Sequence, residues 1–171
     1  MRKLMLALLV VLSAGALNAQ SKVGHVNSQK LLDTLPSRKA AITQLKDFEA
    51  SGMQELGEMQ KDLEAVYAKY DQTQASMSPV IQKIEQEKIM KKEQAFQERQ
   101  QSLQQEMQIY SNELNKPILD RVQKAVEIVS ERRKLNYVID ESVTLYFKGG
   151  TDITAEVLTE LLRMDAEAMK K

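Results

Sequence analysis

The sequence contains no cysteine, and this absence excludes several classes of protein at once. Disulfide-stapled scaffolds and thiolate metal sites both require cysteine, and so does a lipid-anchored N-terminus. A cysteine-free chain of 171 residues must therefore be stabilised by packing or by oligomerisation.

Aromatic residues and net charge are also in short supply. Tryptophan is absent, aromatic residues make up 5% of the chain, and 24 Lys and Arg balance 24 Asp and Glu. A nucleic-acid-binding protein would need a clustered excess of basic residues, so we expect no nucleic acid partner. The abundance of Gln, Glu, Lys, Leu and Ala instead favours long helices.

The first nineteen residues have the pattern of a cleaved secretory signal. Arg2 and Lys3 precede the apolar run Leu4–Leu12, and Leu17-Asn18-Ala19 ends in a small residue. The run is much shorter than the roughly 20 residues of a membrane-spanning helix, which disfavours the alternative of an uncleaved anchor. We expect cleavage after Ala19 and export to a bacterial periplasm, which leaves 22 basic and 24 acidic residues.

Residues 37–134 show the periodicity of two paired helices, and we expect them to form a hairpin arm. Apolar residues alternate spacings of three and four from Leu56 to Tyr70, and they recur every seven residues from Ile89 to Tyr110. Extended backwards, the first of these rows meets Glu49 and Gly52, which predicts a break or a shift of the seam there.

Three local signals set the expected limits of these helices. Ser37 can cap the first helix, and Ser78 can cap a second helix whose first turn holds Pro79. The two helices should therefore run antiparallel and join at residues 76–79. Pro117 lies inside the second helical pattern and should kink it or mark a joint.

Residues 20–36 and 135–171 are expected to form a second part of the mature chain, a small β-containing base. Residues 22–27 favour a short strand, residues 137–140 and 143–147 favour a β-hairpin, and Thr154 can cap a last helix over residues 155–169. Strands this short cannot close a core in one chain, so the base should be completed by association. The residues expected to form this oligomerisation surface are Val23, Val26, Tyr137, Ile139, Val143, Leu145 and Phe147.

The candidate chemical groups favour structural roles. His25 is the only histidine, so it cannot build a zinc site of the usual kind, and Asp140 and Glu141 fall where a turn is needed. Gly149-Gly150 lacks the pattern of a phosphate loop. We therefore expect a non-enzymatic protein with no catalytic residue, no metal ligand and no cofactor.

The arm carries methionines and aromatic residues that could contact variable apolar partners, because flexible thioethers adapt to many shapes. An equally good interpretation is that they fill the seam between the two helices. The residues considered for binding a client polypeptide are Phe48, Met53, Met59, Tyr67, Tyr70, Met77, Val80, Ile84, Ile89, Met90 and Phe96.

The two ends of the mature chain resemble the Skp/OmpH-like periplasmic chaperones. The resemblance is carried by residues 23–32, VGHVNSQKLL, by residues 135–140, LNYVID, by Leu145-Tyr146-Phe147, and by residues 151–158, TDITAEVL. It implies a homotrimer in which base strands of three chains share a β-barrel and three helical arms enclose a cavity. It also implies an ATP-independent holdase whose partners are unfolded outer-membrane proteins.

This chain departs from the family in charge, because the best-known members are strongly basic. Near-neutrality weighs against electrostatic capture of lipopolysaccharide, so client binding should depend on the apolar residues of the arm. Peripheral contact with membrane lipid stays open through the basic residues near Lys134. The alternative function is a structural periplasmic spacer or adaptor that docks by the tip of its hairpin, around residues 75–80.

Overall fold

The computed structural model describes residues 22–170, and the chain divides into two compact units. One unit is helical and spans residues 37–118, and the other, the sheet unit, contains residues 22–36 and 119–170. The expected signal segment, residues 1–19, lies outside the described residues. The elements are β1 (Val23–Val26), α2 (Ser28–Thr34), α3 (Pro36–Thr73), η2 (Gln74–Ser76), α4 (Pro79–Arg133), β2 (Tyr137–Asp140), η3 (Glu141–Val143), β3 (Thr151–Asp152) and α5 (Thr154–Ala168).

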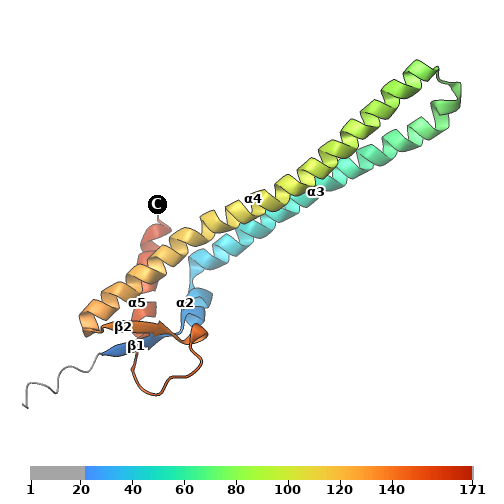
Figure 1. Cartoon of the computed structure of the whole chain (residues 1–171). Helices are drawn as coiled ribbons and strands as arrows, with labels where there is room; N and C mark the ends of the chain where they lie inside the picture. Colours follow the sequence, from blue (N-terminus) through green and yellow to red (C-terminus); the bar gives the residue numbers. More distant parts are fainter. Residues whose placement is uncertain (1–21, 171) are drawn as a thin grey trace, which may run out of the picture. The chain divides into compact units, whose positions relative to one another are not determined.

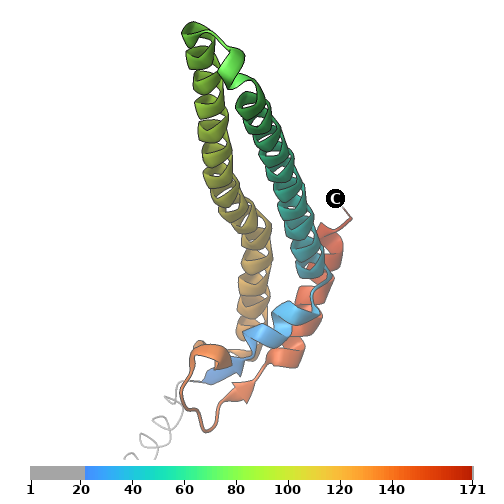
Figure 2. The ribbon, with the colours of Figure 1, turned by 90° about the vertical axis from the view of Figure 1, so that its right-hand side faces the viewer.

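The helical unit is an antiparallel pair made by α3 and the first part of α4, as the sequence predicted (Figures 1 and 2). Cross-helix partners show the direction: the Arg99 side chain donates to Glu55, and the Gln86 amide donates to Tyr70. The residue numbers of these hydrogen-bonded partners rise along α3 as they fall along α4, so the two helices run antiparallel. Among the described helices, none has an apolar stretch of the length that a membrane crossing requires.

The turn between the helices follows the expected signals. The backbone N–H of Ile81 donates to the Ser78 hydroxyl over 3.4 Å, so Ser78 caps α4, and Pro79 takes the first helical position. The predicted cap at the other helix is wrong, because α3 already begins at Pro36 and Ser37 lies inside it. Proline needs no hydrogen-bond partner for its nitrogen in a first turn, which favours this earlier start.

Gly52 belongs to the helix–helix seam, which corrects the predicted break. It is buried, and a Cβ on Gly52 would lie 2.3 Å from a terminal methyl group of Leu103. The missing side chain lets the buried Leu103 side chain insert between the helices. Leu56 and Ile89 are also buried along the seam.

Two glycines of α3 should respond in opposite ways to replacement by alanine. Gly57→Ala should stabilise the protein by about 0.5–1 kcal/mol, because alanine favours the helix and, among the described residues, no atom beyond the local helix lies within 4 Å of the new Cβ. Gly52→Ala should instead lower stability by about 1 kcal/mol, because the cost of overpacking against Leu103 exceeds the same helical gain. Urea unfolding followed by circular dichroism at 222 nm measures both. Equal stabilisation by the two substitutions would contradict this account of the seam.

Helix α4 continues through Pro117 without an interruption in its helical assignment. The boundary between the two compact units falls next to it, between Ile118 and Leu119. Proline cannot donate to the carbonyl of Glu113, four residues earlier, so the helix loses one backbone hydrogen bond at this boundary. The compact helical unit thus ends before residue 134, where the sequence placed the end of the arm.

The sheet unit contains a three-stranded, wholly parallel sheet in the order β2-β1-β3, and the predicted hairpin of residues 137–147 is wrong. Gly24 of β1 pairs with Val138 of β2 on one side and with Thr151 of β3 on the other. The turn residues after β2 explain the difference. Asp140 accepts a hydrogen bond from the Ser142 N–H over 3.0 Å and so starts η3, which turns the chain away from an antiparallel return.

The sheet unit has a buried core of its own, which corrects the expectation that association alone would complete it. Helices α2 and α5 and the end of α4 supply most of this core beside β1. Its side chains with no exposed surface are Leu31, Leu35, Ala125, Val129, Ile153, Val157 and Leu161. Burial of this many aliphatic groups explains why such short strands can be held in place.

Side-chain caps fix the two short helices of this unit. The sequence analysis missed α2, although Asn27 is a standard cap and its side chain accepts from the Lys30 N–H over 2.9 Å. Helix α5 lies close to its predicted position but begins at Thr154, so Thr154 is not its cap. The carboxylate of Asp152 accepts the Thr154 N–H over 2.8 Å instead.

Candidate interaction surfaces

The sheet unit exposes a run of large apolar side chains along residues 137–147, which we call the outer apolar segment. On β2, Tyr137 and Ile139 are exposed while Val138 and Asp140 are half-buried, as the alternation of a strand requires. Beyond β2, the exposed members are Val143, Leu145, Tyr146 and Phe147. Contiguous exposed apolar patches are a common feature of interaction sites.

The backbone of β2 is open to a partner as well. Within the described residues, the sheet order places β2 at one edge, with β1 as its neighbour on the inner side only. An edge strand presents N–H and C=O groups that a strand from another chain can pair with. The outer apolar segment therefore combines apolar side chains with a free strand edge.

The two remaining residues of the expected oligomerisation surface lie elsewhere. Val26 is 5% exposed and belongs to the buried core of its own chain, so it cannot contact another chain directly. Val23 is half-buried in the central strand β1. The seven residues expected to form one surface thus fall into two groups. Those on β1 are buried or half-buried, and those in the outer apolar segment are exposed.

The expected client-binding residues also divide by exposure. Five are exposed: Met53, Tyr67, Val80, Ile84 and Met90. Five are half-buried: Phe48, Met59, Tyr70 and Phe96 on the paired helices, and Met77 in the turn between them. Ile89 is buried, which assigns it to helix pairing. The sequence analysis did not single out Ile42, Ile81 and Ile109, which are also exposed.

An apolar groove of about 370 Å³ lies within the helical unit. Met53, Leu56, Phe96 and Met107 are among the side chains that line it, and glutamines contribute to its walls. Gly57 lines it too, and a Cβ on Gly57 would meet no atom within 4 Å from other segments of the described chain. The groove places two flexible methionines beside an aromatic ring at the surface of an otherwise polar helix pair.

Several charged groups of the helical unit pair with one another. Arg99 bridges the two helices, with one nitrogen 2.9 Å from Glu55 and another 3.2 Å from Glu106. Hydrogen bonds from the Ser102 hydroxyl and from Arg99 hold the pKa of the Glu106 carboxyl below its usual value. With these charges paired, the exposed apolar side chains are the more distinctive feature of this surface.

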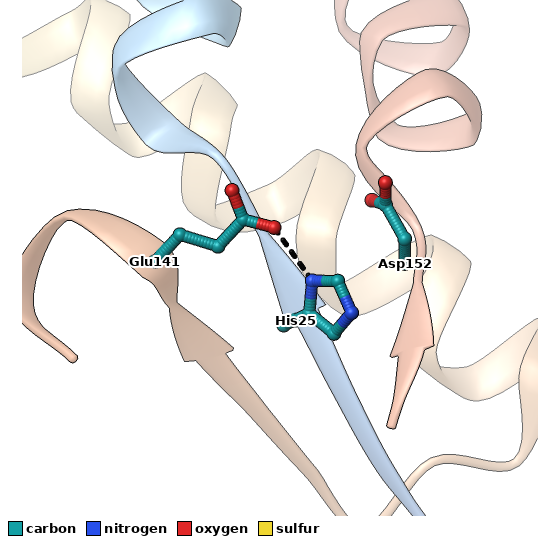
Figure 3. A group of neighbouring side chains, drawn as sticks. All are labelled: His25, Glu141 and Asp152. Atoms are coloured by element: carbon teal, nitrogen blue, oxygen red, sulfur yellow. Dashed lines mark hydrogen bonds and ion pairs between the residues drawn. The ribbon is translucent and has the colours of Figure 1, made fainter. Parts of the chain in front are cut away.

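A separate polar cluster lies in the sheet unit, where His25, Glu141 and Asp152 meet (Figure 3). His25 comes from β1, Glu141 from η3 and Asp152 from β3, and the His25 Nδ1 lies 2.6 Å from a Glu141 oxygen. Hydrogen bonds from the side chain and backbone of Thr154 lower the pKa of Asp152. Sequence reasoning missed this cluster because His25 and Glu141 are 116 residues apart.

Comparisons with known proteins identify relatives in sequence and in fold. The chaperone protein Skp of Photorhabdus luminescens is 28% identical over 165 residues, which cover 94% of this chain and 99% of that protein. Skp of Escherichia coli K12 is 27% identical over 149 residues, covering 86% and 91%. The crystal structure of an OmpH-like protein from Caulobacter crescentus CB15 shares the fold, with a TM-score of 0.73 at 18% identity over 87% of this chain and 86% of that one. The family model described as "Outer membrane protein (OmpH-like)" matches residues 22–161, which is most of the sequence, so this chain belongs to the OmpH-like family.

Proposed function

We propose that this protein is a periplasmic chaperone that keeps unfolded outer-membrane proteins soluble without using nucleotide. The observation that carries the proposal is the set of exposed, flexible apolar side chains on long polar helices, with Met53 and Met90 as examples. Methionine adapts to variable apolar partners, as a chaperone for many sequences requires. The relatives named chaperone protein Skp support the same function.

We further propose that three chains assemble through the outer apolar segment and that their helical hairpins surround the client. Support comes from the exposed apolar side chains of this segment and from the edge position of β2. Several weak contacts on three hairpins would act together, because tethering raises the effective concentration of binding sites. Export through a signal cleaved after Ala19 would deliver the chain to the periplasm.

The test is suppression of aggregation. An unfolded outer-membrane porin is diluted from denaturant into buffer, and light scattering is followed with increasing amounts of the mature protein. We expect suppression near one trimer per porin, with and without ATP. The combined variant Met53→Ser, Val80→Ser, Met90→Ser should need at least about tenfold more protein, because each lost apolar group removes on the order of 1 kcal/mol of contact.

A matched control replaces three exposed glutamines on the same helices, Gln72→Ser, Gln101→Ser and Gln105→Ser. Methionine and glutamine have similar helix propensities and valine resembles serine, so the control loses at least as much helical stability as the test variant. The control should suppress aggregation like the unmodified protein. Scattering that stays unchanged at a large excess of unmodified protein would remove the chaperone proposal. It would leave the adaptor alternative, which the exposure of Val80, Ile81 and Ile84 next to the turn favours.

A further inference from the structure

We propose that His25, Glu141 and Asp152 form a binding site for one divalent transition-metal ion, for which Zn²⁺ is the appropriate probe. Each residue offers one ligand atom, and these atoms all lie within 4.8 Å of one another. An imidazole nitrogen with two carboxylate oxygens is a donor set suited to Zn²⁺ and to related first-row ions. The site lies in the sheet unit and is separate from the surfaces assigned to clients.

The spacing of the ligand atoms fits such an ion after small side-chain rotations. Metal–ligand distances of about 2.0–2.2 Å place two tetrahedral ligand atoms roughly 3.4 Å apart. The His25–Glu141 pair, at 2.6 Å, is closer than this, and the widest pair in the cluster is farther apart. An ion between them would replace the direct His25–Glu141 hydrogen bond with two coordinate bonds.

The surrounding residues hold the three side chains in place. The Asn27 amide donates to one oxygen of Glu141 over 3.0 Å, and the Thr154 N–H donates to one oxygen of Asp152 over 2.8 Å. Such outer contacts orient metal ligands and commonly change metal affinity by about 10–100-fold when they are lost. Each carboxylate is thereby anchored through one oxygen.

The imidazole ring is held as well. The Phe147 ring centroid lies 4.8 Å from that of His25. On the chain segment before β3, Gly150 has φ +97°, and a Cβ there would lie 3.3 Å from Cδ2 of His25. Glycine therefore allows the backbone to pass close to the ring in a conformation that other residues rarely adopt.

Charge and access also favour a cation. Glu141 and Asp152 supply two carboxylates beside one imidazole, and the charges that act on Asp152 are those of His25 and Lys30. Glu141 and His25 are half-buried while Asp152 is exposed, so water can complete the coordination shell. A bound ion would connect β1, η3 and β3, and thus the central strand with both sides of the sheet, so it should stabilise the sheet unit.

The experiment uses the untagged mature chain after treatment with a chelator, titrated with ZnCl₂ in a calorimeter. We expect one Zn²⁺ per chain and a higher melting temperature with the ion present. His25→Gln and Asp152→Asn should each weaken binding by at least about tenfold. Asn at 152 keeps an oxygen that can cap Thr154, so this variant should remain folded. Asp71→Asn, outside the cluster, should bind Zn²⁺ like the unmodified chain.

A second measurement separates the site from general binding to surface carboxylates. Because His25 is the only histidine in the sequence, its ring gives a single set of imidazole resonances. These should shift and saturate at one equivalent of Zn²⁺ but not with Mg²⁺, which prefers oxygen ligands. The proposal is overturned by an unchanged imidazole spectrum, or by His25→Gln binding Zn²⁺ as tightly as the unmodified chain.

Discussion

Replacing Leu145 with aspartate is expected to convert the assembled protein into folded monomers. Leu145 is fully exposed in the single chain, so the substitution removes no contact within the sheet unit. In an assembly formed through the outer apolar segment, the same position would bury an unpaired carboxylate, at a cost of several kcal/mol in each interface. Because three interfaces would be affected together, association at micromolar concentration should be lost.

The measurement is solution mass by light scattering after gel filtration, with circular dichroism to show that the helices persist. Ile139→Asp should act in the same way, since Ile139 is exposed on the edge strand β2. Met169→Asp is the matched control, because Met169 is an exposed apolar residue of the same unit outside the outer apolar segment. A monomeric unmodified protein, or a Leu145→Asp variant of unchanged mass, would contradict assembly through this segment.

Asp165→Ala is expected to destabilise the sheet unit by about 3 kcal/mol. The Asp165 side chain is 1% exposed and lies 3.0 Å from the Arg121 guanidinium, which connects α5 with the end of α4. Removing one partner of a buried ion pair typically costs about 3–5 kcal/mol. Arg121 is 18% exposed and can recover some hydration, which places the expected loss at the lower end.

Urea unfolding of the two forms at one protein concentration measures this loss, because apparent stability of an associating protein depends on its concentration. Glu167→Ala provides the control on the same helix. Its partner is Arg163, and both side chains are more than half exposed, so the loss should be below about 1 kcal/mol. Equal effects of the two substitutions would show that the Arg121–Asp165 pair contributes no more than a surface ion pair.

Local signals made the helical elements predictable. The seam from Leu56 to Tyr70, the cap at Ser78 and the proline at position 79 each act over a few residues, so the sequence shows them directly. The role of Gly52 was predicted wrongly because it does not depend on local signals. Its role depends on Leu103, which lies 51 positions later on the facing helix, and no local pattern reveals that contact.

The candidate sites were less predictable than the helices. The sequence singled out Met53 and Ile89 by the same reasoning, but one is exposed and the other is buried. Val26 and Leu145 were likewise grouped together, although Val26 lies in the core of the sheet unit and Leu145 lies on its surface. Residue type and periodicity predict that a segment has an apolar face. The packing of neighbouring elements decides which part of that face is buried.

By itself, the sequence determined the helical hairpin, its turn and the family resemblance carried by the two chain ends, because apolar periodicity and proline act locally. Only the tertiary structure decided the parallel order β2-β1-β3, the closed core of the sheet unit and the meeting of His25 with Glu141 and Asp152. These features depend on strand pairing across more than a hundred residues. Such pairing is selected by the burial of α2 and α5 against the sheet, and the strand sequences alone do not encode it.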